Sequence, residues 1–130
     1  MAEARYLLDT GLLIRYIRGE QDTVRLLRVL TKRERVAISV VTRIEVRAGM
    51  REHERYRTQK LLSRVRTCDV TKEIADRTGD WLREYRQRGQ TLALPDAIIA
   101  ATALQHRLTL ITLNPKDFPF RSLSLYPLPE

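Results

Sequence analysis

The stretch from Leu92 to Leu104 is the most apolar run of the chain, and one carboxylate, Asp96, follows Pro95 near its start. Because proline fits the first turn of a helix, where its missing N–H costs nothing, we expect a helix that begins at Pro95 or Asp96. The residues that follow mix small alanines with large aliphatic side chains, so this helix is apolar on nearly every side and is expected to be buried. Asp96 either caps the helix, whose dipole helps to keep it ionised, or belongs to a functional site.

Length and composition favour one globular domain that spans residues 1–130. Charged residues make up 31% and apolar residues 43% of the chain, and no run reaches the ~18 apolar residues of a membrane span. The first residues lead into a strand-like segment without a secretory signal, so we expect a cytoplasmic protein. Cys68 is the only cysteine, which excludes an internal disulfide and a cysteine-based metal site and favours a place in the core.

The chain is basic, with 24 lysine and arginine residues against 16 acidic residues and a net charge of +8. A charge of this size and sign favours an anionic partner, and nucleic acid is the first candidate. The same surplus is also compatible with arginines that are solvated on helix surfaces, because no segment is dense enough to form a basic tail.

Strand-like and helix-like patterns alternate along the chain. We expect strands at residues 5–8, 36–40, 67–70 and 109–112, and the tail 122–126 is a candidate edge strand. We expect helices at residues 12–17, 22–33, 42–51, 53–64 and 71–88, besides the helix that contains Asp96. This order is typical of an α/β protein in which helices cover both faces of a mainly parallel central sheet of four to five strands.

Three carboxylates follow the ends of predicted strands. Asp9 directly follows the first strand, Glu45 lies about one helical turn after the second, and Asp117 lies in the turn after the last. Ligands bind beyond the carboxyl ends of parallel strands, so we expect these carboxylates at one edge, where Asp96 joins them if its loop rises that far. Asp9 and Asp117 also have local interpretations, as a helix cap and a turn residue. Glu45 can likewise close a capping box that begins at Thr42.

Several carboxylates at one edge of a basic chain would repel one another unless a cation lay among them. A ligand set of oxygens suits a hard ion, Mg²⁺ or Mn²⁺, which acts on phosphate oxygens. The two histidines, His53 and His106, do not lie at strand ends. The chain also has no glycine-rich phosphate loop, so a histidine-based site and a nucleoside triphosphate site are both disfavoured.

Four blocks of the sequence, in this order, resemble the PIN-domain family and its VapC-type toxins of toxin–antitoxin pairs. They are YLLDT at 6–10, ISVVTRIE at 38–45, PDAIIAATA at 95–103 and LITLNPKDF at 110–118. The resemblance covers nearly the whole chain. It implies a three-layer α/β/α sandwich, a metal-dependent endoribonuclease that uses Mg²⁺ or Mn²⁺, an inhibitory antitoxin and a homodimer.

Carried over by position, Asp9, Glu45 and Asp96 match the three core acids of the family as catalytic and metal-binding residues. The fourth acidic position falls on Asn114 in some members and on the acid of the Asp-Phe pair, here Asp117, in others. Asn114 carries no charge, so the resemblance favours Asp117 as the fourth ligand.

The neighbours of these acids are also suggested by the resemblance. Three hydroxyls and one amide are candidates for contacts behind the ligands: Thr10, Thr42, Thr112 and Asn114. The chain departs from many relatives at Gly11, where they have asparagine, so a polar contact beside Asp9 is in question. Arg47 lies two residues after Glu45, and Arg51 lies four residues after Arg47; both are candidates for holding RNA, although both can equally be solvated.

The expected reaction is hydrolysis of RNA phosphodiester bonds, most readily in single-stranded or looped RNA, whose bases and phosphates are accessible. Apolar and aromatic residues that core packing explains equally well could supply a dimer interface: Tyr56, Leu61 and Trp81. One alternative is a non-catalytic RNA-binding or protein-interaction module on the same fold. A second is a receiver domain, for which Thr112 and Lys116 give slight support, but it needs paired acids after the first strand and only Asp9 is there.

Overall fold

A parallel sheet of four strands forms the centre of the computed structural model, which describes residues 4–128. The strands lie in the order β3-β2-β1-β4. Their bounds are Ala4–Leu8 for β1, Arg35–Ser39 for β2, Arg66–Cys68 for β3 and Thr109–Ile111 for β4. Since β1 pairs with β2 on one side and with β4 on the other, the carboxyl ends of three strands meet at one edge.

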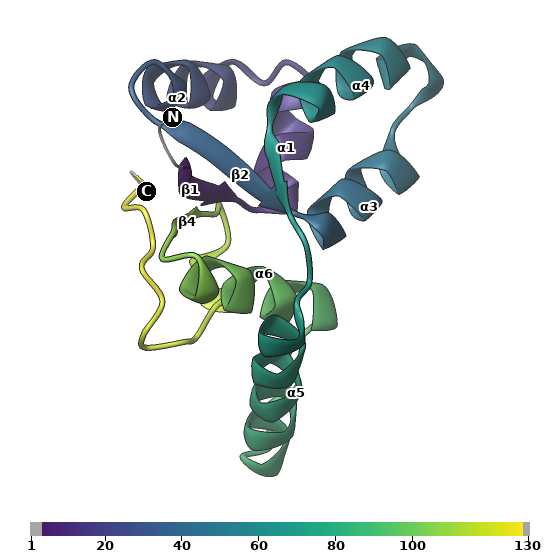
Figure 1. Cartoon of the computed structure of the whole chain (residues 1–130). Coiled ribbons are helices and arrows are strands. Elements are labelled where there is room, and N and C mark those ends of the chain that lie inside the picture. Colours follow the sequence, from purple (N-terminus) through teal and green to yellow (C-terminus); the bar gives the residue numbers. More distant parts are fainter. Residues whose placement is uncertain (1–3, 129–130) are drawn as a thin grey trace.

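Helices cover both faces of the sheet (Figure 1). Helices α1–α4 lie on one side, and α6 lies on the other with α5 packed against it. The helices are α1 (Thr10–Ile17), α2 (Gln21–Thr31), α3 (Val40–Gly49), α4 (Arg55–Arg64), α5 (Lys72–Gln87) and α6 (Leu94–Gln105). The expected three-layer α/β/α sandwich with a parallel sheet is therefore confirmed. Within the described residues, none of these helices is long and apolar enough to span a membrane.

The alternation of side chains along each strand produces two cores. Leu7 of β1 faces the α5 and α6 side, where it joins a cluster that includes Ile99 and the buried Cys68. Leu8, the next residue, faces the opposite side and joins a cluster with Leu12 of α1. Two separate cores on the two faces of one sheet explain why the strands read as continuous apolar runs.

Helix α6 is the buried helix that the apolar run predicts. Its small residues let it lie close to the sheet, and several are fully buried: Ala97, Ala100, Ala101 and Ala103. The helix begins at Leu94 rather than at Pro95 or Asp96, and Pro95 lies in its first turn. Asp96 is therefore the third residue of the helix and lies in its first turn.

The second strand and the helix after it differ from the prediction. Strand β2 ends at Ser39 instead of Val40, and α3 begins at once, because the Ser39 side chain accepts a hydrogen bond from the N–H of Val41 (3.1 Å). Thr42 is therefore the third residue of α3, and the expected capping box from Thr42 to Glu45 is wrong.

Three further expectations are corrected. The predicted helix 53–64 is a short 3₁₀ turn, Glu52–Glu54, followed by α4. Tyr56, expected inside, is 74% exposed, because it lies on the outer side of α4, whose buried residues are Thr58 and Leu62. The tail 122–126 forms one isolated bridge, Leu125 with Leu110, beside β4 and not a full edge strand.

The buried hydroxyl of Thr58 allows a test of how an unsatisfied polar group affects stability. It has no hydrogen-bond partner among the described residues. We predict that Thr58→Val raises the free energy of unfolding by about 1 kcal/mol, because it removes an unsatisfied buried polar group. Thr78→Val is the control and should destabilise by about 1 kcal/mol, because the Thr78 hydroxyl donates to the Ile74 carbonyl (2.7 Å). Urea unfolding measures both, and equal losses in the two variants would contradict the prediction.

Candidate active site

Asp9 is held at the end of β1 by hydrogen bonds to both carboxylate oxygens. It is the N-cap of α1, where Oδ1 accepts from the Thr10 N–H (2.8 Å). Oδ2 accepts from the Thr112 hydroxyl (2.7 Å), which follows β4. Its own N–H donates to the Ile111 carbonyl (3.0 Å). Asp9 is thus both a cap and a residue fixed between two strand ends, with 7% of its surface exposed.

Glu45 is tied to the start of α1. The Thr10 hydroxyl donates to Glu45 Oε1 (2.7 Å) and lies 2.9 Å from the Thr42 hydroxyl oxygen. Glu45 reaches this position because Ser39 starts α3 directly after β2, which puts Glu45 in the second turn. Sequence reasoning missed the role of Ser39, although a serine followed by an apolar helical pattern is an N-cap signal.

Asp96 enters the site from the first turn of α6. The N-cap of this helix is Ala93, and no side-chain bond caps it, so Asp96 is not the helix cap. Burial, followed by the negative charges of Asp9, Asp117 and Glu45, raises the pKa of Asp96 to about 6. Burial and like charges therefore raise the pKa of Asp96 although the helix dipole, as expected for an acid in the first turn, favours its ionised form.

The same electrostatic field acts on Asp9. Burial raises the pKa of Asp9, the hydrogen bonds from Thr112 and Thr10 partly offset this effect, and Glu45 and Asp117 raise the pKa further. All four predicted acids therefore lie close enough to influence one another. Across residues 4–128, no three histidine, cysteine, aspartate or glutamate side chains approach closely enough to enclose one ion. The four acids therefore lie in one region of the described structure, but no three of them surround a common position for an ion.

Asp117 and Asn114 both lie in the exposed turn after β4. Asp117 ends the 3₁₀ turn Pro115–Asp117, and its N–H donates to the Asn114 carbonyl (3.0 Å). The Asn114 N–H donates to the Thr112 hydroxyl (3.0 Å), which in turn donates to Asp9. Asp117 contributes charge to the site, whereas the described contact of Asn114 is made by its main chain.

The two arginines predicted to hold RNA, Arg47 and Arg51, do not contact the four acids in the described structure. Arg47 and Arg51 are exposed, and neither forms a hydrogen bond or ion pair with the four acids in the described part of the chain. The N–H of Arg51 donates instead to the buried Glu54 (2.8 Å). Gly11, next to the site, has open space around it, so this position would accommodate the asparagine of many relatives.

The comparisons with known proteins agree with the fold. The family model of the PIN domain matches residues 6–122. Ribonuclease VapC10 of Mycobacterium tuberculosis is 40% identical over 113 residues, which cover 87% of this chain and 85% of the relative. Ribonuclease VapC2 of Rickettsia felis is 28% identical over 119 residues, which cover 87% of this chain and 89% of the relative. The chain belongs to the PIN-domain family.

Solved structures have the same fold. A chain of a toxin–antitoxin complex from Klebsiella pneumoniae is 36% identical, with a TM-score of 0.78 and coverage of 97% of this chain and 98% of that chain. A chain of the VapBC2 complex from Rickettsia felis, bound to a DNA fragment from its promoter, is 26% identical with a TM-score of 0.81. That match covers 93% of this chain and 96% of the other.

The raised pKa of Asp96 predicts a pH-dependent stability. Its carboxyl loses a proton near pH 3.8 when unfolded and near pH 6 when folded, so its ionisation lowers stability as pH rises through this interval. In EDTA, Asp96→Asn should therefore raise the free energy of unfolding above pH 6 by about 1–2 kcal/mol, after allowance for solvent screening. The gain should vanish near pH 4. Urea unfolding across this range measures it, and an equal gain from Asp76→Asn, an exposed position on α5, would contradict the explanation.

Proposed function

We propose that this chain is a metal-dependent endoribonuclease, the toxin of a toxin–antitoxin pair, which hydrolyses RNA phosphodiester bonds. The observation that carries the proposal is the pair of carboxylates Asp9 and Asp96, which lie on different elements. Burial and the nearby charges of Glu45 and Asp117 raise the pKa of both. A chain keeps such a pair at a cost in stability, which a bound cation offsets. Relatives that carry the name ribonuclease support the reaction class.

The donor chemistry of the site fits Mg²⁺ or Mn²⁺. Every predicted ligand is a carboxylate, Asp9, Asp96, Glu45 and Asp117, and Mg²⁺ is commonly bound through one or two carboxylates while it keeps several waters. Asp9 and Asp96 would hold the ion directly, with Glu45 and Asp117 around it. When bound, the ion supplies a Lewis acid that polarises a phosphate oxygen and lowers the pKa of a water.

The neighbouring hydroxyls keep the carboxylates in position. Thr112 occupies one oxygen of Asp9, and Thr10 occupies Oε1 of Glu45, so each acid is fixed in one orientation. The second oxygen of Glu45 remains to orient the attacking water or to accept its proton. The Thr42 hydroxyl oxygen lies 2.9 Å from the same Thr10 hydroxyl, so α3 contacts the start of α1 at two of its residues. Asn114 acts through its N–H on Thr112.

The proposal includes a cytoplasmic location, an inhibitory antitoxin and a homodimer. The similar structures from Klebsiella pneumoniae and Rickettsia felis are toxin–antitoxin and VapBC complexes, which supports the antitoxin. Of the three candidate interface residues, Tyr56 is well exposed, whereas Trp81 is half-buried and stacks on Phe120 of its own chain, with ring centroids 4.1 Å apart. Tyr56 is therefore the better candidate for contacting a second copy. Arg47 and Arg51 stay as candidates for holding the RNA backbone.

Cleavage of RNA with and without metal tests the proposal. The purified chain should cleave a mixed RNA pool with Mg²⁺ or Mn²⁺, and EDTA should abolish the activity. Asp9→Asn and Asp96→Asn should each lower the cleavage rate at least 100-fold, because each removes a charge that holds the ion. Asp76→Asn is the matched control and should cleave at the wild-type rate. RNA binding without cleavage, unaffected by both site variants, would instead indicate a non-catalytic RNA-binding module.

A further inference from the structure

A pocket of about 680 Å³ lies between the second half of α5 and the segment that follows Asp117. One wall consists of α5 and the loop after it, and the other consists of residues 119–122. The Tyr85 hydroxyl donates to the Pro119 carbonyl (2.8 Å) and joins the two walls. We call this cavity the α5–tail pocket.

Three of the eight aromatic residues of the chain line the α5–tail pocket. Phe120 is buried and forms the floor, where Trp81 stacks on it with ring centroids 4.1 Å apart, and Tyr85 packs on it at an angle with centroids 5.5 Å apart. Trp81 and Tyr85 are four residues apart on α5, so they lie on one face of the helix. Both are half-buried, which leaves part of each ring open to the pocket. Aromatic rings at a surface are platforms on which nucleic-acid bases stack.

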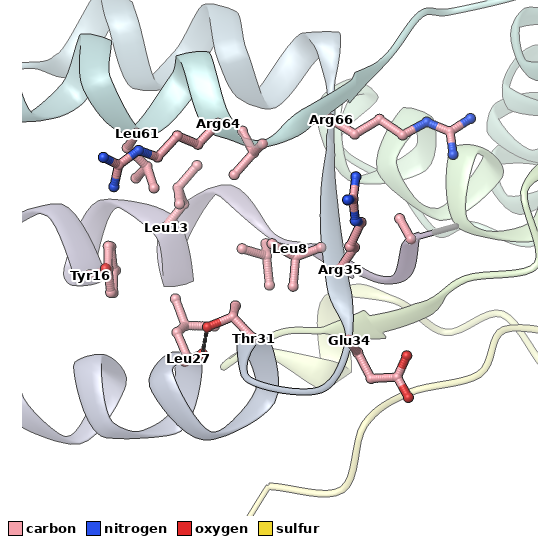
Figure 2. A pocket seen from close by; sticks show the side chains of 13 residues that line it. Leu8, Leu13, Tyr16, Leu27, Thr31, Glu34, Arg35, Leu61, Arg64 and Arg66 are labelled. Carbon is pink, nitrogen blue, oxygen red and sulfur yellow. Dashed lines mark hydrogen bonds between the residues drawn. The ribbon is translucent and has the colours of Figure 1, made fainter. Parts of the chain in front are cut away.

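A second cavity of about 680 Å³, between α2 and α4, has a different lining. Figure 2 shows three aliphatic side chains in its interior, Leu8, Leu13 and Leu27. Tyr16 is the single aromatic residue that lines it in the described part of the chain. Aliphatic side chains offer a base no flat ring to stack on, so of these two cavities the α5–tail pocket is the one suited to nucleotides.

Two arginines, Arg88 and Arg121, stand at the rim of the α5–tail pocket. The guanidinium of Arg88 lies 5.2 Å from the ring centroid of Tyr85 and forms an ion pair with Glu84, which is the one acidic residue of the lining. Arg121 is exposed and forms no ion pair with the residues that the structure describes. Guanidinium groups beside aromatic rings can hold phosphates while the neighbouring base stacks.

The α5–tail pocket is close to the carboxylates along the chain. Phe120 follows Asp117 by three residues, so their Cα atoms are at most about 11 Å apart. On the other wall, Gln90 belongs to the loop that leads to Asp96 in the first turn of α6. Phosphates repeat every ~3.4 Å along a helical strand, so an RNA whose cleaved bond lies at the acids reaches the pocket within a few nucleotides.

We propose that the α5–tail pocket binds a nucleotide of the RNA that lies a few positions from the cleaved bond. Trp81 and Tyr85 contact its base, and Arg88 and Arg121 hold the phosphates beside it. The inference rests on the proposed function, in which RNA is the substrate of the acids. Stacking on aromatic rings accepts any base, so the pocket anchors the strand without selecting a sequence. It strengthens binding of the substrate and takes no part in the chemical step.

Trp81 is the only tryptophan of the chain, so its fluorescence reports on the pocket directly. In EDTA, which prevents metal-dependent cleavage, octaadenylate should quench this fluorescence as it binds, and an abasic oligomer of equal length should bind at least 10-fold more weakly. Arg88→Gln/Arg121→Gln should weaken octaadenylate binding at least 5-fold. The matched control is Arg83→Gln/Arg86→Gln, which changes two exposed arginines of α5 that do not line the pocket, and it should alter binding less than 2-fold.

Cleavage kinetics with Mg²⁺ separate anchoring from catalysis. For a labelled single-stranded RNA, Arg88→Gln/Arg121→Gln should raise KM at least 5-fold and change kcat less than 2-fold, because the pocket binds substrate and transition state equally.

Equal binding of octaadenylate and the abasic oligomer, or equal effects of the two double variants, would overturn the proposal. Displacement of octaadenylate by octaglutamate at equal concentration would overturn it in favour of an acidic peptide. Base-dependent binding at the pocket without any cleavage by the unaltered chain would contradict the proposed function and would still support RNA binding at this pocket.

Discussion

Repulsion between carboxylates at one edge of the sheet sets the chemistry of the site. Asp9 and Asp96 come from elements far apart in the sequence, and burial and like charges raise both pKa values. A chain selected for stability alone would place a neutral pair there. The hydroxyls of Thr112 and Thr10 orient two of the acids but neutralise neither, so the charge is left for a cation to balance.

The fold supplies this edge and separates it from a cavity with a basic lining. Parallel strands direct their carboxyl ends to one side, and the closely packed alanines of α6 bring Asp96 to the same side. The amino ends of β1, β2 and β3 border a cavity between α2 and α4 that several arginines line. The sheet therefore lies between the acids at one end and these arginines at the other.

Much of the fold and the identity of the acids could be predicted from the sequence, because both depend on local patterns. Alternating strands and helices place Asp9, Glu45 and Asp117 after strand ends, whichever residues pair across the sheet. The hydrogen bonds that hold these acids could not be predicted. Thr112 and Asp9 are 103 positions apart in the sequence and meet only because β4 pairs with β1. The ionisation of Asp96 depends on burial by several elements, and the α5–tail pocket depends on how the segment after Asp117 packs on α5, so neither has a local signal.

The pKa of Asp96, measured with and without Mg²⁺, shows whether these carboxylates form a metal site. Carboxyl ¹³C NMR of the chain labelled at aspartate, assigned with Asp96→Asn, follows this group through a pH titration. We expect a pKa of about 6 for Asp96 in EDTA. With saturating Mg²⁺ we expect a pKa at least one unit lower, because a cation among the carboxylates favours their ionised form. A pKa near 4 in EDTA, or one near 6 that Mg²⁺ leaves unchanged, would contradict the claim that these acids form a metal site.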